Sequence, residues 1–82
     1  MKLSVVIPVL NEEENLKQAL DNVTNLSGIH EIIVVDGGSS DRTLEIAQAT
    51  RAKVISSKAG RGTQLDAGWR VASGEIICFL HA

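Results

Sequence analysis

The chain has 82 residues and a net charge of −2, and its 44% hydrophobic and 22% charged residues favour one small globular domain over a disordered segment. With one Phe, one Trp, no Tyr and no basic cluster longer than two residues, it offers little for nucleic-acid binding. No apolar stretch approaches the ~20 residues of a transmembrane segment, and Cys78 is a lone cysteine, typical of a reduced thiol, so we expect a cytoplasmic protein.

The first expected elements are a strand and an amphipathic helix. Residues 3–10 are mostly apolar and β-branched, as in a strand that is covered on both faces. Asn11 can cap the next helix, with Glu14 three residues on as in a capping box, and Gly28 ends that helix. Its inward face is expected to carry an apolar stripe, formed by Leu16, Ala19, Leu20, Val23 and Leu26.

The second expected strand, residues 31–36, places one carboxylate at its carboxyl end. Asp36 is followed by Gly37 and Gly38, and a helix is expected over residues 41–52. An ionised acid at such a position needs a partner, because burying it alone is costly. Asp36 is therefore either a ligand-binding group or the cap of its own glycine turn.

The third strand, residues 53–56, leads through a loop into the third helix. The loop over residues 57–62 carries Arg61 between two glycines, which loosen its backbone. The third helix is expected over about residues 63–72. Its inward residues are Leu65, Trp69 and Ala72, so Trp69 is interpreted as a core residue and not as a ligand platform.

The fourth strand, residues 75–80, is apolar on both faces, and no helix comes after it to cover it. We therefore interpret residues 1–82 as one subdomain, the first half of something larger. The element order βαβαβαβ predicts an α/β fold with three layers, similar to the Rossmann fold. Right-handed crossovers then give a parallel sheet in the strand order 3-2-1-4.

This strand order gathers polar residues from several loops at one crevice. Ligands bind at the carboxyl ends of parallel strands, beside the point where the strand order reverses. Here that point falls between strands one and four. The residues that come after strands one to three can all reach it, namely Asn11, Glu12, Asp36, Gly60, Arg61 and Gly62.

Several nucleotide-binding classes are disfavoured by the residues just after the first strand. The chain has no G-x-G-x-x-G at that point and no Walker A sequence, and the negative charges of residues 12–14 would repel a pyrophosphate. NAD, FAD and P-loop chemistry are therefore not expected. A phosphorylated receiver domain is disfavoured as well, because the fourth strand offers no Asp or Thr.

A resemblance to a known family is carried by three segments, SVVIPVLNEEENL, EIIVVDGGSSDRT and GRGTQLDAGWRVASGEIICFLHA. In order and spacing they resemble the amino-terminal part of family-two glycosyltransferases with the GT-A fold, over essentially the whole chain. The Gly-Arg-Gly-x-Gln and Phe-Leu-His-Ala patterns look closest to the bacterial branch called selenodomain-associated transferases. The resemblance implies that this part binds the nucleotide of a nucleotide-diphosphate sugar, such as a UDP- or GDP-sugar.

The resemblance also implies roles for particular residues. Asp36 matches the acid that accepts a hydrogen bond from the base, typically from N3–H of uracil. Gly37 stands where many relatives have a second Asp, so the usual base and ribose contacts change there. The first-strand residues that match positions against the base and ribose are Pro8, Asn11 and Glu12.

Arg61 matches a basic family position that faces the nucleotide, where a guanidinium can meet phosphate or a base edge, and Gly60 and Gly62 let that backbone come close. Simpler interpretations remain open for two of these residues. Arg61 could be a surface residue in a flexible loop, and Glu12 could belong to a solvated first helical turn that the helix dipole favours.

The metal and catalytic groups of the family are not expected within this chain. His81 matches the first position of the family's Asp-x-Asp motif and Ala82 the second, so the Asp that binds Mg²⁺ or Mn²⁺ would come next, at position 83. By resemblance, the general base and the acceptor site belong to the second half, and the sugar is transferred with inversion. We expect residues 1–82 alone to be inactive.

The sequence leaves two functions from different classes. The first is the donor-nucleotide part of an inverting glycosyltransferase with an unknown acceptor, whose full-length form could lie at the periphery of a membrane. The second is a stand-alone nucleotide-binding or interaction module that dimerises through its exposed fourth strand.

Overall fold

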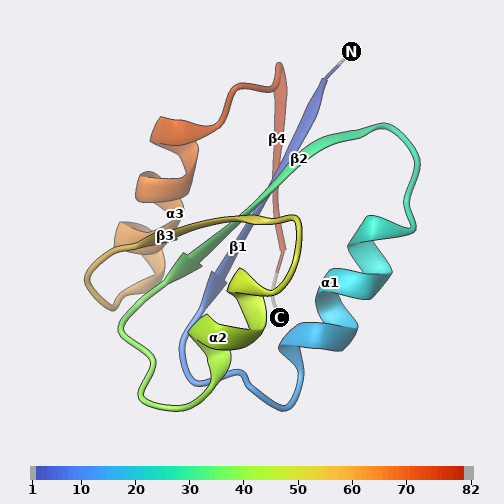
Figure 1. The fold of residues 1–82 in the computed structure, drawn as a ribbon. Coiled ribbons are helices and arrows are strands. Elements are labelled where there is room, and N and C mark those ends of the chain that lie inside the picture. Colours follow the sequence, from blue (N-terminus) through green and yellow to red (C-terminus); the bar gives the residue numbers. More distant parts are fainter. Residues whose placement is uncertain (1, 81–82) are drawn as a thin grey trace.

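The computed structural model describes residues 2–80 as an alternating series of strands and helices (Figure 1). In chain order the elements are β1 (Leu3–Val9), α1 (Leu16–Thr24), β2 (Ile29–Asp36), α2 (Thr43–Gln48), β3 (Lys53–Ser56), α3 (Arg61–Val71) and β4 (Ile76–Phe79). This order confirms the expected βαβαβαβ series. Several boundaries differ by a few residues, and α2 is half as long as expected.

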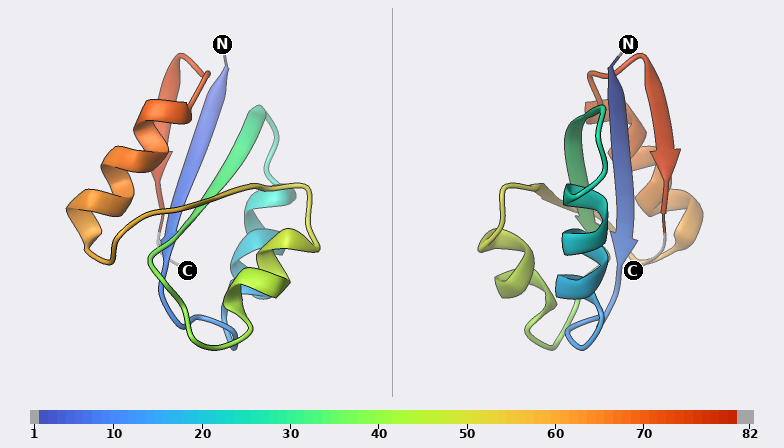
Figure 2. Two further views of the ribbon diagram at one scale, coloured as in Figure 1. Left: turned by 60° about the vertical axis from the view of Figure 1, so that its left-hand side comes forward. Right: turned by 90° about the vertical axis from the view of Figure 1, so that its right-hand side faces the viewer.

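The strands form one parallel sheet in the order β3-β2-β1-β4, as the sequence predicts. Figure 2 shows α3 on one side of this sheet and α1 with α2 on the other, so the fold has three layers. β1 lies between β2 and β4, where both of its edges are hydrogen-bonded. The reversal of strand order therefore falls between β1 and β4.

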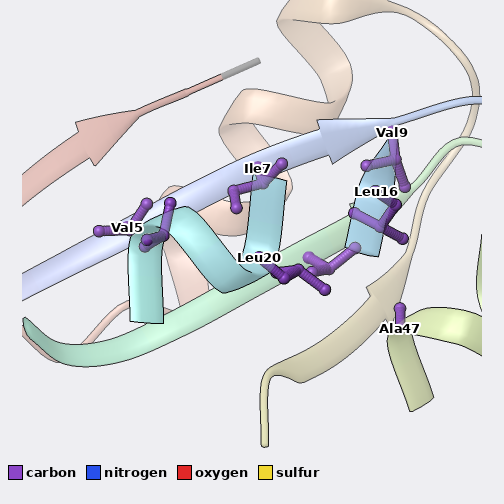
Figure 3. Packing of buried hydrophobic residues seen from close by; sticks show 8 residues of the cluster. Val5, Ile7, Val9, Leu16, Leu20 and Ala47 are labelled. Atoms are coloured by element: carbon purple, nitrogen blue, oxygen red, sulfur yellow. The ribbon is translucent and has the colours of Figure 1, made fainter. Parts of the chain in front are cut away.

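Strand alternation divides the buried residues between two packing layers. Val5, Ile7 and Val9 of β1 pack toward α1, where Leu16 and Leu20 meet them (Figure 3). The intervening Val6 and the β2 residues beside it pack toward α3. Burying a side chain of this size contributes about 1.5–3 kcal/mol, so both layers are needed to stabilise a domain this small.

α1 does not begin with the expected capping box, so that prediction is wrong. Asn11 has a positive φ of 53° and its side chain accepts a hydrogen bond from the backbone N–H of Ser40, 2.8 Å away, instead of capping α1. The Glu12 carbonyl accepts N–H groups of the next turn, and the helix begins only at Leu16. Leu26 was expected in the apolar stripe, but α1 ends before it and its side chain is 59% exposed.

The inward face of α3 also differs from the expected one. Trp69 is 58% exposed, so its interpretation as a core residue is wrong. The face that meets the sheet carries Gly68, where an added Cβ would lie 2.3 Å from Cγ1 of Val6 and 3.1 Å from Cγ2 of Val35. α3 packs through its backbone at this point, which turns the neighbouring Trp69 outward.

The amino end of the sheet is fastened by the carboxylate of Glu31. Its Oε2 accepts hydrogen bonds from the hydroxyl of Ser4 at 2.7 Å and from the N–H and hydroxyl of Ser73 at 2.6 and 2.7 Å. Burial alone would raise the pKa of Glu31, but these hydrogen bonds and the nearby His30 lower it to about 2. The N–H of Gly74 donates to Ser4 Oγ at 2.8 Å, so β1, β2 and the turn before β4 are joined.

The outer edge of β4 is apolar. Ile76 and Phe79 are 45% and 43% exposed, and β4 pairs only with β1 among residues 2–80. None of the helices in the described part of the chain has the length and apolar character needed to cross a membrane.

Candidate functional site

An open depression lies at the carboxyl end of β1, where α3 begins. It is lined by residues of the β1 end and of the α3 start, namely Pro8, Val9, Leu10, Glu12, Gly60, Arg61 and Gln64. The structure thus brings together four of the predicted site residues, Pro8, Glu12, Gly60 and Arg61. Two further predicted residues, Asp36 and Gly37, lie next to this lining at the end of β2, because the Gly37 N–H donates to the Val9 carbonyl at 3.0 Å.

Asp36 is buried, with 4% of its surface exposed, and binds donors of its own turn. Its Oδ2 accepts the N–H groups of Gly38 and Ser39, both at 3.1 Å, and its Oδ1 accepts the hydroxyl of Ser39. These contacts are those of a cap on the glycine turn. They also satisfy a carboxylate whose burial would otherwise be costly.

Ser39 connects this turn to the loop after β1. The N–H of Asn11 donates to Ser39 Oγ at 2.9 Å, and the Ser39 hydroxyl in turn donates to Asp36. Figure 1 shows the two loops side by side below the sheet. Asn11 therefore belongs to the support of the site, since it binds the neighbouring loop and does not line the depression.

A second pair of contacts holds Glu12 and Glu13 against the start of α2. The N–H of Glu12 donates to Thr43 Oγ1 at 2.7 Å, and the N–H of Glu13 donates to Asp41 Oδ2 at 3.2 Å. Burial would raise the pKa of Asp41, but its hydrogen bonds from the hydroxyl and N–H of Thr43 and from Glu13 lower it overall. Asp41 is thus an ionised anchor for both loops, and the Glu12 backbone is fixed at the rim of the depression.

The α3 side of the depression is formed by Gly60 and Arg61. Gly60 has a φ of 137°, which glycine adopts without strain, and Arg61 begins the helix with its side chain exposed. The amino end of a helix and a guanidinium both favour anions. The loop expected over residues 57–62 therefore ends two residues earlier, and Arg61 is placed on a regular element.

Sequence reasoning missed Gln64 as a site residue. This side chain is 5% exposed, and its amide contacts backbone groups at the ends of β1 and β2 and in the turn before α3. The available signal was a polar residue four positions before Gly68, on the face of α3 that meets the sheet. Asp66, by contrast, is exposed and pairs with Arg70 at 2.8 Å.

The described residues do not form a metal site. Among residues 2–80 no group of three or more His, Cys, Asp or Glu side chains is placed to hold a metal ion. His81, which matches the first position of the family's metal motif, lies outside the described residues.

The chain matches known proteins along its whole length. The family model for glycosyl transferase family 2 matches residues 4–82. Dolichol-phosphate mannosyltransferase of Pyrococcus furiosus is 39% identical over 100% of this chain and 26% of that protein. Glucosyl-3-phosphoglycerate synthase of Mycolicibacterium smegmatis is 37% identical over 98% of this chain and 30% of that protein.

The fold is also found in solved structures. The crystal structure of glucosyl-3-phosphoglycerate synthase from Mycobacterium tuberculosis in complex with Mn²⁺, UDP and glucosyl-3-phosphoglycerate superposes with a TM-score of 0.86 at 33% identity. The match covers 98% of this chain and 33% of that one. Another structure of that enzyme contains Mg²⁺ and UDP. The chain thus spans about a quarter to a third of the length of the relatives it matches.

Proposed function

Because the chain belongs to glycosyl transferase family 2, we propose that it binds the nucleotide of a nucleotide-diphosphate sugar and forms the donor part of an inverting glycosyltransferase. The observation that carries this proposal is the depression that Pro8, Glu12, Gly60 and Arg61 line at the carboxyl end of β1, which is one of the two strands beside the reversal of strand order. The UDP complex of the M. tuberculosis enzyme supports a uridine nucleotide, while a GDP-sugar is the other donor class proposed.

The polar groups of the depression suit the parts of a nucleoside diphosphate. The Arg61 guanidinium and the amino end of α3 offer positive charge to phosphate oxygens. Pro8 presents a rigid apolar surface and Glu12 a carboxylate, which suit a base or ribose and its hydroxyl groups.

Asp36 is proposed to accept the N3–H of uracil beside this depression. Its oxygens already take two N–H groups and the Ser39 hydroxyl. The hydroxyl is the one donor of these that can rotate, since the N–H groups are fixed by the backbone. By turning slightly, the Ser39 hydroxyl would therefore leave a lone pair of Oδ1 for the base N–H and still connect the two loops.

Sugar transfer requires groups beyond those described. A divalent cation would stabilise the leaving diphosphate, and a general base would activate the acceptor hydroxyl. We propose that Mg²⁺ or Mn²⁺ serves the full-length enzyme, which the Mn²⁺ and Mg²⁺ complexes of the M. tuberculosis enzyme support. We also propose that residues 1–82 alone bind donor nucleotide without transferring sugar, and that the chain falls in the selenodomain-associated branch.

Calorimetric titration of the folded chain with UDP and with GDP, each with and without Mn²⁺, tests the proposal. We expect saturable UDP binding that Arg61→Ala weakens at least about tenfold, because a phosphate contact is lost. Trp69→Ala is the matched control, since it removes an exposed side chain from the same helix outside the depression. A folded chain that does not bind either nucleotide, or an Asp36→Ala variant that binds normally, would contradict the assignment.

A second candidate function is a dimerising interaction module. It is favoured by the exposure of Ile76 and Phe79 on β4, which offers an unpaired apolar edge among the described residues. Sedimentation analysis separates the candidates. A discrete dimer that Phe79→Lys converts to monomer, in a sample that does not bind nucleotide, would support the module.

A further inference from the structure

Gln64 joins three backbone segments at the floor of the depression. Its Nε2 donates to the carbonyl of Val9 at 2.9 Å and to the carbonyl of Val35 at 3.0 Å. Its Oε1 accepts the N–H of Gly60 at 3.2 Å. One amide thus spans the ends of β1 and β2 and the turn before α3.

The contacts of Gln64 allow only one orientation of the amide. Both protons of Nε2 are used, and reversing the group would face its oxygen toward two carbonyl oxygens. The side chain is 5% exposed, so water does not readily replace a lost partner. Gln64 is therefore a fixed part of the floor and not a mobile surface group.

The position of Gln64 explains the glycine at position 37. Gly37 does not have a positive φ, so its backbone would accept another residue. A Cβ at that position, however, would lie 2.9 Å from both Cδ and Oε1 of Gln64 and 3.0 Å from its Nε2. The end of a glutamine can usually move aside, but here moving it breaks three hydrogen bonds. The amide of Gln64 thus occupies the space of a side chain at position 37.

From this geometry, and resting on the proposed function, we propose that Gln64 is a positioning residue for the nucleoside diphosphate and acts as a pair with Gly37. It holds the Gly60 backbone, and with it Arg61, at a set place relative to the end of β2, where Asp36 lies. Gln64 makes this contribution without donating to the nucleotide, because both of its N–H protons are committed to carbonyls. Nucleotide affinity then depends on the three-way bridge and not on a contact with the ligand.

A double-mutant cycle of Gly37→Ala and Gln64→Ala tests the pair, with urea unfolding and UDP titration as readouts. In the presence of Gln64 we expect Gly37→Ala to weaken UDP binding about tenfold and to lower the unfolding midpoint. In the Gln64→Ala background the same change should alter UDP affinity less than about twofold, because the clash is gone. Gln64→Ala alone should weaken UDP binding about tenfold.

Two controls separate positioning from general loss of stability. Ser4→Ala removes hydrogen bonds at the opposite end of the same sheet and should lower stability without changing UDP affinity. Gln64→Met keeps the volume of the side chain but loses the bridge, so it should weaken UDP binding like Gln64→Ala. It also supplies the readout if Gln64→Ala does not fold.

Two results would overturn the proposal. One is a folded Gln64 variant that binds UDP as tightly as the unaltered chain. The other is a cost of Gly37→Ala that is the same with and without Gln64. If the unaltered folded chain does not bind UDP, the proposed function fails, and the role of Gln64 in positioning the nucleotide site fails with it. The unfolding data still decide whether positions 37 and 64 are coupled.

Discussion

The two ends of the sheet each hold one carboxylate with serine hydroxyl and backbone N–H groups, but over different distances along the chain. Asp36 at the carboxyl end takes its partners from residues two and three positions on. Glu31 at the amino end takes its partners from Ser4 and Ser73, which are 27 and 42 positions away. The amino-end acid therefore fastens separate elements together, whereas the carboxyl-end acid shapes a single turn.

Neutral groups make most of the long-range connections at the carboxyl end. The Gln64 amide reaches the carbonyls of Val9 and Val35, while the ionised Asp41 adds one bond to the N–H of Glu13. The loops there are thus held largely through amides and hydroxyls, and the charged side chains of the depression stay at its rim. We expect changes at the amino end to affect stability, and changes at the carboxyl end to affect nucleotide binding as well.

The largest expected effect is at Gly74. A Cβ there would lie 2.4 Å from Ser4 Oγ, 2.8 Å from Ser4 N and 2.9 Å from the Lys2 carbonyl, and two of these are backbone atoms that cannot turn aside. Gly74→Ala should cost about 3 kcal/mol in the free energy of unfolding, measured by urea denaturation. Gly62→Ala is the matched control, because nothing lies within 4 Å of a Cβ there and alanine favours the helix. Equal stability of the two variants would contradict the close packing of Gly74 against β1 at the amino end of the sheet.

The next effect concerns Glu31 and pH. Its pKa is lowered from 4.5 to about 2 in the folded chain, so the unfolded chain binds the proton more tightly. The stabilisation is complete above pH of about 5 and is lost as the pH falls toward about 2. Glu31→Gln should cost about 2 kcal/mol at neutral pH and make the melting temperature less dependent on pH over that window. Parallel curves for the two proteins would show that Glu31 does not fasten the sheet.

A smaller stability effect is expected at Ser39, together with a binding effect. Ser39→Ala removes the hydroxyl between the Asn11 N–H and Asp36, at a cost of about 1 kcal/mol. Because the loop that carries Glu12 is then held less firmly, UDP affinity should fall several-fold in calorimetry. Glu31→Gln serves as the control, since it should cost more stability while leaving UDP affinity unchanged. If Glu31→Gln weakened UDP binding while Ser39→Ala left it unchanged, the distinction between the two ends of the sheet would be contradicted.

The smallest effect is expected at Trp69, which lies on the outer face of α3 and is 58% exposed. Trp69→Ala should change the free energy of unfolding by less than about 0.5 kcal/mol and leave UDP binding unaltered. Thermal melting and the same titration measure both. A loss of several kcal/mol would restore the interpretation of Trp69 as a core residue.

The strands and their order were predictable because β-branched apolar runs and right-handed crossovers leave few alternatives. The ends of the helices were less predictable. Asn11 and Glu14 fit a capping box in sequence, yet the Asn11 side chain binds Ser40 of another loop. Trp69 was misassigned because side-chain apolarity outweighed the close backbone approach at Gly68. Such contacts depend on residues far along the chain and leave no local pattern.

Part of the candidate site was also predictable, because it follows from the order of the strands. Pro8, Glu12, Gly60 and Arg61 lie at strand ends or at the start of a helix, so topology alone brings them to one depression. Gln64 could not be found in this way, because its partners Val9 and Val35 lie 55 and 29 positions away. Its role becomes visible only when the three backbone groups are placed together.

The most direct test of the difference between the two ends is a two-dimensional amide NMR spectrum of the isotope-labelled chain, recorded as UDP is added. We expect the shifts to concentrate at the carboxyl end, at Gly37, Gly60 and Arg61, while the amides of Glu31 and Gly74 stay in place. Shifts centred on the amino end, or no shifts in a folded chain, would contradict the assignment of the nucleotide site.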